Sequence, residues 1–207
     1  MIRDAITEFM SFAAKFYTFS IDLNHVDRQL FTKFRIKVPL HPVEPLQHLY
    51  ARMIAYLNSY SEGLLFSQGL FDQTQPTLWE KNVIGEVLRW IEVGVPDKKK
   101  LELALRLPPP INYHIYFYEH AQIPEFCHHL RGSKTNWVAP FAFSLIDPDF
   151  LENLLPYENS SPTWEVTIID GHLYLVCDKR EFDTVVLPVD IWNAYQESIQ
   201  ESTGKVG

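Results

Sequence analysis

The sequence predicts a mixed α/β domain, with one central β-sheet flanked by helices and an antiparallel hairpin near each end of the chain. Three observations support this fold class. Strand-like and helix-like stretches alternate through the middle of the chain. Toward the C-terminus, Asp170-Gly171 separates two alternating apolar runs, which is a strong hairpin signal. Toward the N-terminus, residues 15–22 and 28–38 alternate apolar and polar side chains on either side of a polar turn.

Length and composition fit one domain of ordinary size. The chain has 207 residues, 46% of them hydrophobic and 21% charged, so it can bury a substantial core. We expect a short helix or a leader at residues 1–14, a single domain at 15–197 and a flexible tail at 198–207. The net charge of −8 argues against a generally basic surface for nucleic acid.

Several features favour a cytoplasmic protein without membrane association. The first residues contain Asp4 and Glu8, which interrupt the apolar core that a signal peptide needs. No apolar stretch approaches the roughly 20 residues of a membrane span. Two cysteines, Cys127 and Cys177, do not make a disulfide framework or a cysteine-rich zinc site.

The first half of the chain is expected to hold a hairpin, a long helix and two strands. In residues 28–38, Lys33, Arg35 and Lys37 share one strand face, which is typical of a solvated surface. A helix at 43–58 has apolar residues at helical spacing, with Glu44 and His48 one turn apart on another stripe. The remaining expected elements are a short apolar piece at 64–66 and a strand that begins at residue 85.

The second half is expected to alternate helices with strands before the final hairpin. Asp97 is a good helix N-cap, and Pro140 inside an expected strand suggests an edge position or a bulge. The expected helices lie at residues 98–105, 121–130, 147–154 and 190–196, and the expected strands at 113–118, 137–144, 164–169, 172–177 and 183–188.

Glu92 is the most conspicuous candidate for a functional residue. It lies near the end of an otherwise apolar strand, and a buried carboxylate is unfavourable unless it is paired, hydrogen-bonded or bound to a metal ion. Lys98, Lys99 and Lys100 follow shortly after it, in the first turn of the next expected helix. There they oppose the helix dipole, so they do not stabilise that helix.

Together with Glu44 and the loop residue Asp72, this group suits metal-assisted hydrolysis of a phosphodiester. Carboxylates hold Mg²⁺, the ion lowers the pKa of bound water, and a lysine offsets charge on the phosphate. A purely structural explanation is also open, because exposed lysines are often tolerated without function and Glu44 is favourable at a helix N-terminus in any case. Residue types alone do not choose between them.

Other chemistries have less support. His128 and His129 are adjacent on an expected helix and point about 100° apart, so they do not suit one zinc ion. The sequence has no Gly-x-Ser-x-Gly elbow, phosphate-binding loop or dinucleotide fingerprint.

Several segments resemble the YaeQ family, over roughly residues 15–195. They are HPVEPLQHLYARMIAYLN at 41–58, LLFSQGL at 64–70, QPTLW at 75–79, GEVLRWIEVGVPD at 85–97, the Asp170-Gly171 hairpin and the closing LPVDIW. The resemblance implies a variant of the PD-(D/E)XK, or restriction-endonuclease-like, core. It also implies that Glu44 is the helix glutamate and Glu92 the strand glutamate of a metal site, to which the carbonyl of Val93 would contribute.

The chain departs from the nuclease pattern at two important positions. Gly94 stands where the superfamily has its lysine, and Thr77 stands at the expected acid after the proline. Asp72 is the one acid left in that loop, so a substitute lysine would have to come from residues 98–100. These losses would weaken the activation of water.

We therefore expect a binding or regulatory module with weak or no hydrolytic activity and weak binding of Mg²⁺. One alternative is a cytosolic interaction protein whose cleft is only a relic of the fold. The other is a Mg²⁺-dependent nuclease in which Glu92 acts with Lys98, Lys99 or Lys100. Its partner could be a nucleic acid or a protein, and the sequence does not indicate an oligomeric state.

Overall fold

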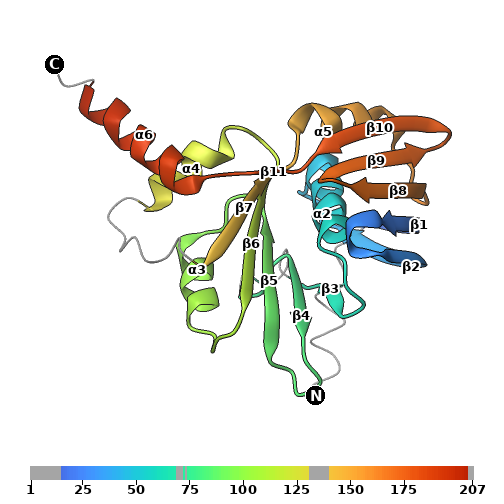
Figure 1. Ribbon diagram of the computed structural model, residues 1–207, viewed down its shortest axis with the longest axis horizontal. Helices are drawn as coiled ribbons and strands as arrows, with labels where there is room; N and C mark the ends of the chain where they lie inside the picture. The colour runs from blue at the N-terminus through green and yellow to red at the C-terminus, as the bar shows by residue number, and fades with distance from the viewer. Residues whose placement is uncertain (1–14, 69–71, 73, 131–139, 205–207) are drawn as a thin grey trace.

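The strands form two mixed sheets, one of five strands and one of six (Figure 1). The computed structural model describes residues 15–68, 72, 74–130 and 140–204, with side chains up to residue 199. The mixed α/β class is confirmed, whereas the expectation of one central sheet is wrong. The hairpins from the two ends of the chain pair with each other and form a second sheet.

The five-stranded sheet joins the first and last parts of the chain in the order β10-β9-β8-β1-β2. The predicted antiparallel pairs β1–β2 and β8–β9 are both present, and β1 lies parallel to β8. Asp170 and Gly171 both have positive φ angles, 51° and 76°, as a tight two-residue hairpin turn requires. The strands are β1 (Lys15–His25), β2 (Leu30–Leu40), β8 (Thr163–Ile169), β9 (His172–Cys177) and β10 (Arg180–Val185), with a 3-10 turn at Val26–Arg28.

The six-stranded sheet has the order β11-β7-β6-β5-β4-β3, with β5, β6 and β7 parallel. β4 has no counterpart among the predicted strands, because four residues are too few to show an alternating pattern. Pro140 precedes β7, so the predicted proline inside that strand is wrong, and residues 137–139 lie outside the described residues. The strands are β3 (Leu64–Phe66), β4 (Leu78–Lys81), β5 (Val87–Val93), β6 (Asn112–Phe117), β7 (Phe141–Leu145) and β11 (Leu187–Pro188).

Helix α2 (Leu46–Asn58) lies between the two sheets, as Figure 1 shows. All residues from Leu49 to Leu57 are buried, because one side of the helix meets the five-stranded sheet and the other meets the six-stranded sheet. The helix begins at Leu46, with Pro45 at its N-cap, instead of at residue 43 as predicted. The single apolar stripe predicted from the sequence therefore understates how deeply this helix is buried.

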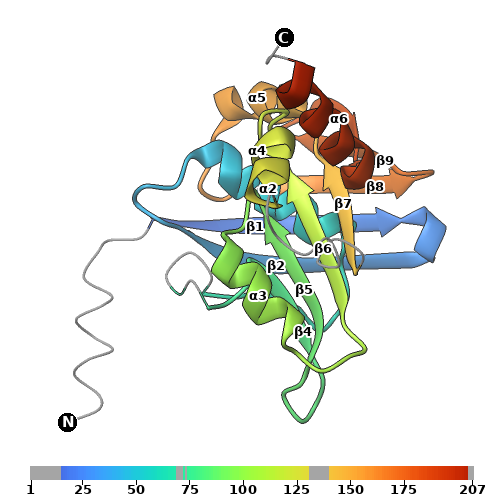
Figure 2. The same ribbon diagram turned by 90° about the vertical axis from the view of Figure 1, so that its left-hand side faces the viewer.

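The opposite face of the six-stranded sheet is covered by α3 (Lys98–Leu105) and α4 (Gln122–Leu130), which Figure 2 shows in front of it. α5 (Pro148–Leu154) continues into a 3-10 turn, Leu155–Tyr157, and packs against α2 and β10. The last helix, α6 (Ile191–Gly204), extends beyond its predicted end at Gln196.

The predicted limits of the domain stay a prediction. Residues 1–14, expected as a helix or leader, and 205–207 of the expected tail lie outside the described residues. Across the described part of the chain, no helix is both long and apolar enough to cross a bilayer.

Candidate functional site

Glu44, just before α2, is the acceptor in a buried ion pair with Arg52. Arg52 donates from Nε to Oε1 at 2.7 Å and from Nη2 to Oε2 at 2.9 Å. The backbone N–H of His41 adds a third hydrogen bond to Oε2, at 3.0 Å. The side chains of Glu44 and Arg52 are only 2% and 3% exposed. Arg52 also donates to the carbonyl of Pro39 at 2.9 Å, which ties the end of β2 to α2.

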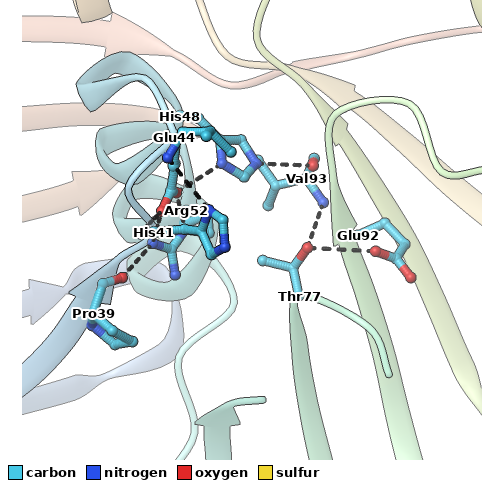
Figure 3. Close-up of polar contacts among 9 residues, drawn as sticks. Pro39, His41, Glu44, His48, Arg52, Thr77, Glu92 and Val93 are labelled. Carbon is cyan, nitrogen blue, oxygen red and sulfur yellow. Dashed lines mark hydrogen bonds and ion pairs between the residues drawn. The ribbon is translucent and has the colours of Figure 1, made fainter. Parts of the chain in front are cut away.

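His48 links this ion pair to β5. Its Nδ1 lies 2.8 Å from Glu44 Oε1, and its Nε2 lies 3.2 Å from the carbonyl oxygen of Val93. Both partners can only accept, so both hydrogen bonds form together only when each ring nitrogen carries a hydrogen. Figure 3 shows the imidazole between Glu44 and Val93, two of the predicted metal ligands.

Glu92, near the end of β5, is held by a second set of donors. Lys100 Nζ lies 2.9 Å from Oε2, and the indole N–H of Trp90 donates to Oε1 at 2.8 Å. The hydroxyl of Thr77 donates to Oε2 at 3.4 Å. The Glu92 side chain is 3% exposed and that of Lys100 is 13% exposed, so this is also a largely buried ion pair.

Thr77 connects the two sets of contacts through the backbone of Val93. Its hydroxyl oxygen accepts from the Val93 N–H at 3.2 Å and donates to Glu92 (Figure 3). The carbonyl of the same residue, Val93, contacts His48. The hydrogen bonds therefore run from α2 through β5 to α3, across the middle of the molecule.

The two carboxylates lie on opposite sides of the six-stranded sheet. Ile91 and Val93 pack with α2, whereas Trp90 packs with α3 and α4. Side chains alternate along a strand, so Glu92 shares the face of Trp90. Glu44, which is bound to residues of α2, lies on the other face.

The backbone explains why residue 94 is not a lysine. Gly94 has a φ of +88°, in the left-handed region, and its N–H donates to the carbonyl of Tyr116 at 2.8 Å. A Cβ at this position would lie 3.4 Å from the ring of Tyr118 and on a strained backbone. Lys100 reaches Glu92 from the next helix instead.

The other predicted site residues lie nearer the surface. Asp72 accepts from the backbone and hydroxyl of Thr74 at 2.9 and 2.6 Å, and from the amide of Gln75 at 2.9 Å. These hydrogen bonds, and to a smaller extent the charge of Lys100, hold the pKa of Asp72 below its usual range. Lys98 and Lys99 are exposed at the start of α3.

The surroundings of the two buried carboxylates shift their pKa values in opposite directions. Burial raises the pKa of Glu44, but the hydrogen bond from His48 and the charge of Arg52 outweigh it, so the pKa is lower than usual. Burial raises the pKa of Glu92 above its usual value, against the opposing influence of Lys100. Glu44 is thus firmly ionised, and ionisation of Glu92 depends on its lysine.

These side chains, as arranged, do not fit a divalent metal ion. Mg²⁺ needs free carboxylate or carbonyl oxygens directed at one point. Glu44, Val93 and Glu92 direct theirs at Arg52 or His48 and at Lys100. Among the described residues, no three His, Cys, Asp or Glu side chains are grouped as a metal site.

Arg52 is the important residue that the sequence analysis did not identify. Its signal was the spacing of Glu44, His48 and Arg52, which lie four residues apart and therefore share one helical stripe. An arginine among apolar helix residues is itself a sign of a buried partner. Lys100, by contrast, was among the predicted lysines, and it is the one in contact with Glu92.

Comparison with known proteins gives a consistent family. The family model described as YaeQ protein matches residues 10–186. The uncharacterized protein YaeQ of Escherichia coli (strain K12) is 25% identical over 174 residues, which cover 84% of this chain and 94% of that protein. The protein of the same name from Salmonella typhi is 26% identical over 166 residues, or 80% and 90% of the two chains.

Two solved structures have a similar fold. The crystal structure of YaeQ protein from Pseudomonas syringae has a TM-score of 0.75 and 25% identity, and the match covers 86% of this chain and 97% of that one. The YaeQ protein of Xanthomonas axonopodis pv. citri, at 18% identity and a TM-score of 0.75, supports the fold alone over 85% and 98% of the chains. Because the family model matches most of this chain, the chain belongs to the YaeQ family.

Proposed function

We propose that the chain is a binding or regulatory module with little or no hydrolytic activity, on a core related to that of PD-(D/E)XK nucleases. One observation carries the proposal: the two buried carboxylates assigned to metal binding, Glu44 and Glu92, are each engaged by a cationic side chain of the protein. Arg52 contacts Glu44, and Lys100 contacts Glu92. The protein therefore supplies the positive charge that a divalent ion would otherwise bring.

The energetics of buried charge support this proposal. Breaking a buried ion pair by taking away one partner costs about 3–5 kcal/mol. A metal ion would have to displace Arg52 from Glu44 and Lys100 from Glu92 before it could bind both carboxylates. Thr77 adds only a neutral hydroxyl at the position of the expected acid. Weak binding of Mg²⁺ and a cytoplasmic location, both expected from the sequence, belong to this proposal.

One observation favours the alternative, a Mg²⁺-dependent nuclease with a migrated lysine. Lys100 contacts Glu92 from α3, and the charge of Lys100 also lowers the pKa of Asp72. In that alternative, Glu92 and Asp72 would hold the ion, and Lys100 would offset charge on the phosphate. Glu44 would take no part, because its partners lie on the other face of the sheet.

A cleavage assay distinguishes the two functions. Labelled single- and double-stranded DNA and RNA are incubated with the purified chain and Mg²⁺ or Mn²⁺. We expect no cleavage above that of the Glu92→Gln variant. Cleavage that is lost in Glu92→Gln and Lys100→Met, but kept in the matched variant Lys99→Met, would establish the nuclease and overturn our proposal.

A further inference from the structure

β2 is an edge strand with a long unpaired side. It runs over Leu30–Leu40, ends the order β10-β9-β8-β1-β2, and pairs with β1 along its whole length (Figure 1). In the described part of the chain, no other strand pairs with it. The edge ends at Pro39, which has no N–H and whose carbonyl accepts from Arg52.

The pairing of β1 shows which backbone groups of β2 face outward. The N–H groups of Thr18 and Ser20 bond to carbonyls that lead into β8, so the odd-numbered residues of β1 bond to β2. Their register partners in β2 are the even-numbered residues, such as Phe34 and Ile36. The odd-numbered residues of β2 therefore direct N–H and C=O groups toward the open edge: Phe31, Lys33, Arg35 and Lys37.

The side chains of β2 form two different rows along this edge. The odd-numbered residues are exposed, with Phe31 at 66%, and three of the four are basic. The even-numbered residues Leu30, Thr32, Phe34 and Ile36 are half-buried. Their neighbours on β1 are almost fully buried, from 0 to 7% exposed. The core of the five-stranded sheet is therefore incompletely covered at β2.

We propose that the β2 edge binds an extended acidic segment of a partner protein, which adds to the sheet as a further strand. Main-chain hydrogen bonds to the odd-numbered residues would hold the segment, as in other cases of strand addition. Side chains alternate along a strand. Acidic residues at every second position would thus lie beside Arg35 and Lys37, and beside Lys33, which already pairs with Asp22 of β1. Apolar residues between them would cover Phe34 and Ile36.

Charge argues against two other occupants of this edge. A second copy paired antiparallel about Arg35 would place Lys33 opposite Lys37 and Arg35 opposite itself, and like charges directly opposite are destabilising. A polynucleotide lying across this face would meet acidic side chains of β1 and β8, whereas a strand added beyond β2 would have the basic row between it and those acids. A hollow of about 550 Å³ there is lined by Asp22 and Glu165 as well as by Lys33 and Arg35.

Basic residues on edge strands also discourage unwanted pairing. Protection of the edge does not by itself require a half-buried apolar row beside the basic residues. The basic and apolar rows together specify a partner in which acidic and apolar residues alternate. The inference extends the proposed binding function but does not involve Glu44 or Glu92. The outcome of the cleavage assay therefore does not affect the test of the β2 edge.

The test uses the full chain and a short fluorescein-labelled peptide of alternating glutamate and valine. We expect saturable binding by fluorescence anisotropy that weakens as salt is added, because the charges are exposed. A peptide of alternating lysine and valine should not bind. Failure of the glutamate peptide to bind, or equal binding of the lysine peptide, would overturn the proposal.

Two variants at one position separate backbone pairing from charge. Arg35→Ala removes the charged side chain but keeps the backbone N–H, and should weaken binding about two- to fivefold, as expected for one exposed pair. Arg35→Pro also removes an outward N–H without touching the bonds to β1, and should weaken binding about tenfold or more. Equal affinity in the two variants contradicts strand addition, as does tighter binding of a single-stranded oligonucleotide or an Arg35-dependent dimer in sedimentation.

Because Arg35→Pro could disturb β2 itself, charge reversal supplies a second readout. The double variant Lys33→Glu with Lys37→Glu should lose the glutamate peptide and gain the lysine peptide. Circular dichroism confirms that each variant is folded. If the double variant retains the preference of the unchanged protein, the basic row does not select the partner and the inference is wrong.

Discussion

Replacing Arg52 with methionine tests whether Glu44 is stabilised by protein cations. Arg52 makes two hydrogen bonds to Glu44 and one to the carbonyl of Pro39, with its side chain 3% exposed. Its guanidinium carbon lies 5.6 Å from the ring centre of Phe66, so methionine can fill apolar space there. The substitution removes the charge and the donors while keeping most of the volume.

The contacts of Glu44 give the size of the effect. Removing one partner of a buried ion pair costs about 3–5 kcal/mol. His48 and the backbone of His41 still donate to the carboxylate, so we expect the lower end, about 3 kcal/mol. In a chain of this size, 1 kcal/mol corresponds to about 2–4 °C in Tm, so the Tm should fall by about 6–12 °C.

Urea unfolding followed by tryptophan fluorescence measures this loss. Lys33→Met is a matched control, because Lys33 pairs with Asp22 at 2.6 Å but is 79% exposed. That surface pair should contribute little to stability, because solvent screens it. If Arg52→Met lowers the free energy of unfolding no more than Lys33→Met does, the buried ion pair is not stabilising Glu44 and the reasoning fails.

Three further predictions concern the other charged groups. Asp97→Ala should lower the free energy of unfolding by about 1 kcal/mol, because the carboxylate caps α3 through a 2.8 Å bond from the Lys100 N–H, whereas Asp97→Asn should not. The pKa of Glu44 is lower in the folded state than in the unfolded state, so its stabilisation is present above the unfolded-state pKa and is lost as the pH falls through the folded-state pKa. Glu44→Gln should flatten that acid limb in urea titrations at several pH values. Lys100→Met should raise the pKa of Glu92 further, measured by carboxyl NMR, whereas Lys99→Met should leave it unchanged.

Local signals in the sequence were enough to predict many of the elements. Asp170-Gly171 fixes the β8–β9 turn, because both residues adopt positive φ angles there. Asp97 caps α3 as expected, and its side chain accepts from the N–H three residues on. In each case a few neighbouring residues determine the structure, so no distant contact is needed to predict it.

The arrangement of these elements depends on distant pairs. The two sheets arise because β1 pairs with β8, which joins Ser20 to Thr163 across most of the chain. A hairpin pattern contains no information on a partner so far away. Burial of α2 on all sides follows from the same pairing, since the five-stranded sheet covers the side of the helix that the six-stranded sheet leaves open.

The candidate site was predicted only in part, because it too depends on contacts between distant residues. Glu92 and Lys100 lie eight residues apart, on a strand and the helix that follows it, so the sequence could bring them together. The contact of His48 with the carbonyl of Val93 joins two elements 45 residues apart and depends on how α2 packs on β5. That packing separates Glu44 from Glu92, which the residue types alone would have placed around one ion.

Titration of divalent ions tests most directly whether the carboxylates are occupied by the protein's own cations. Mg²⁺ and Mn²⁺ are added to the chain and to Glu92→Gln in a calorimeter. We predict weak heats that do not saturate at millimolar concentrations and are the same for both proteins. Saturable binding of an ion that is lost in Glu92→Gln would show that Lys100 yields its place to a metal, and would contradict the account.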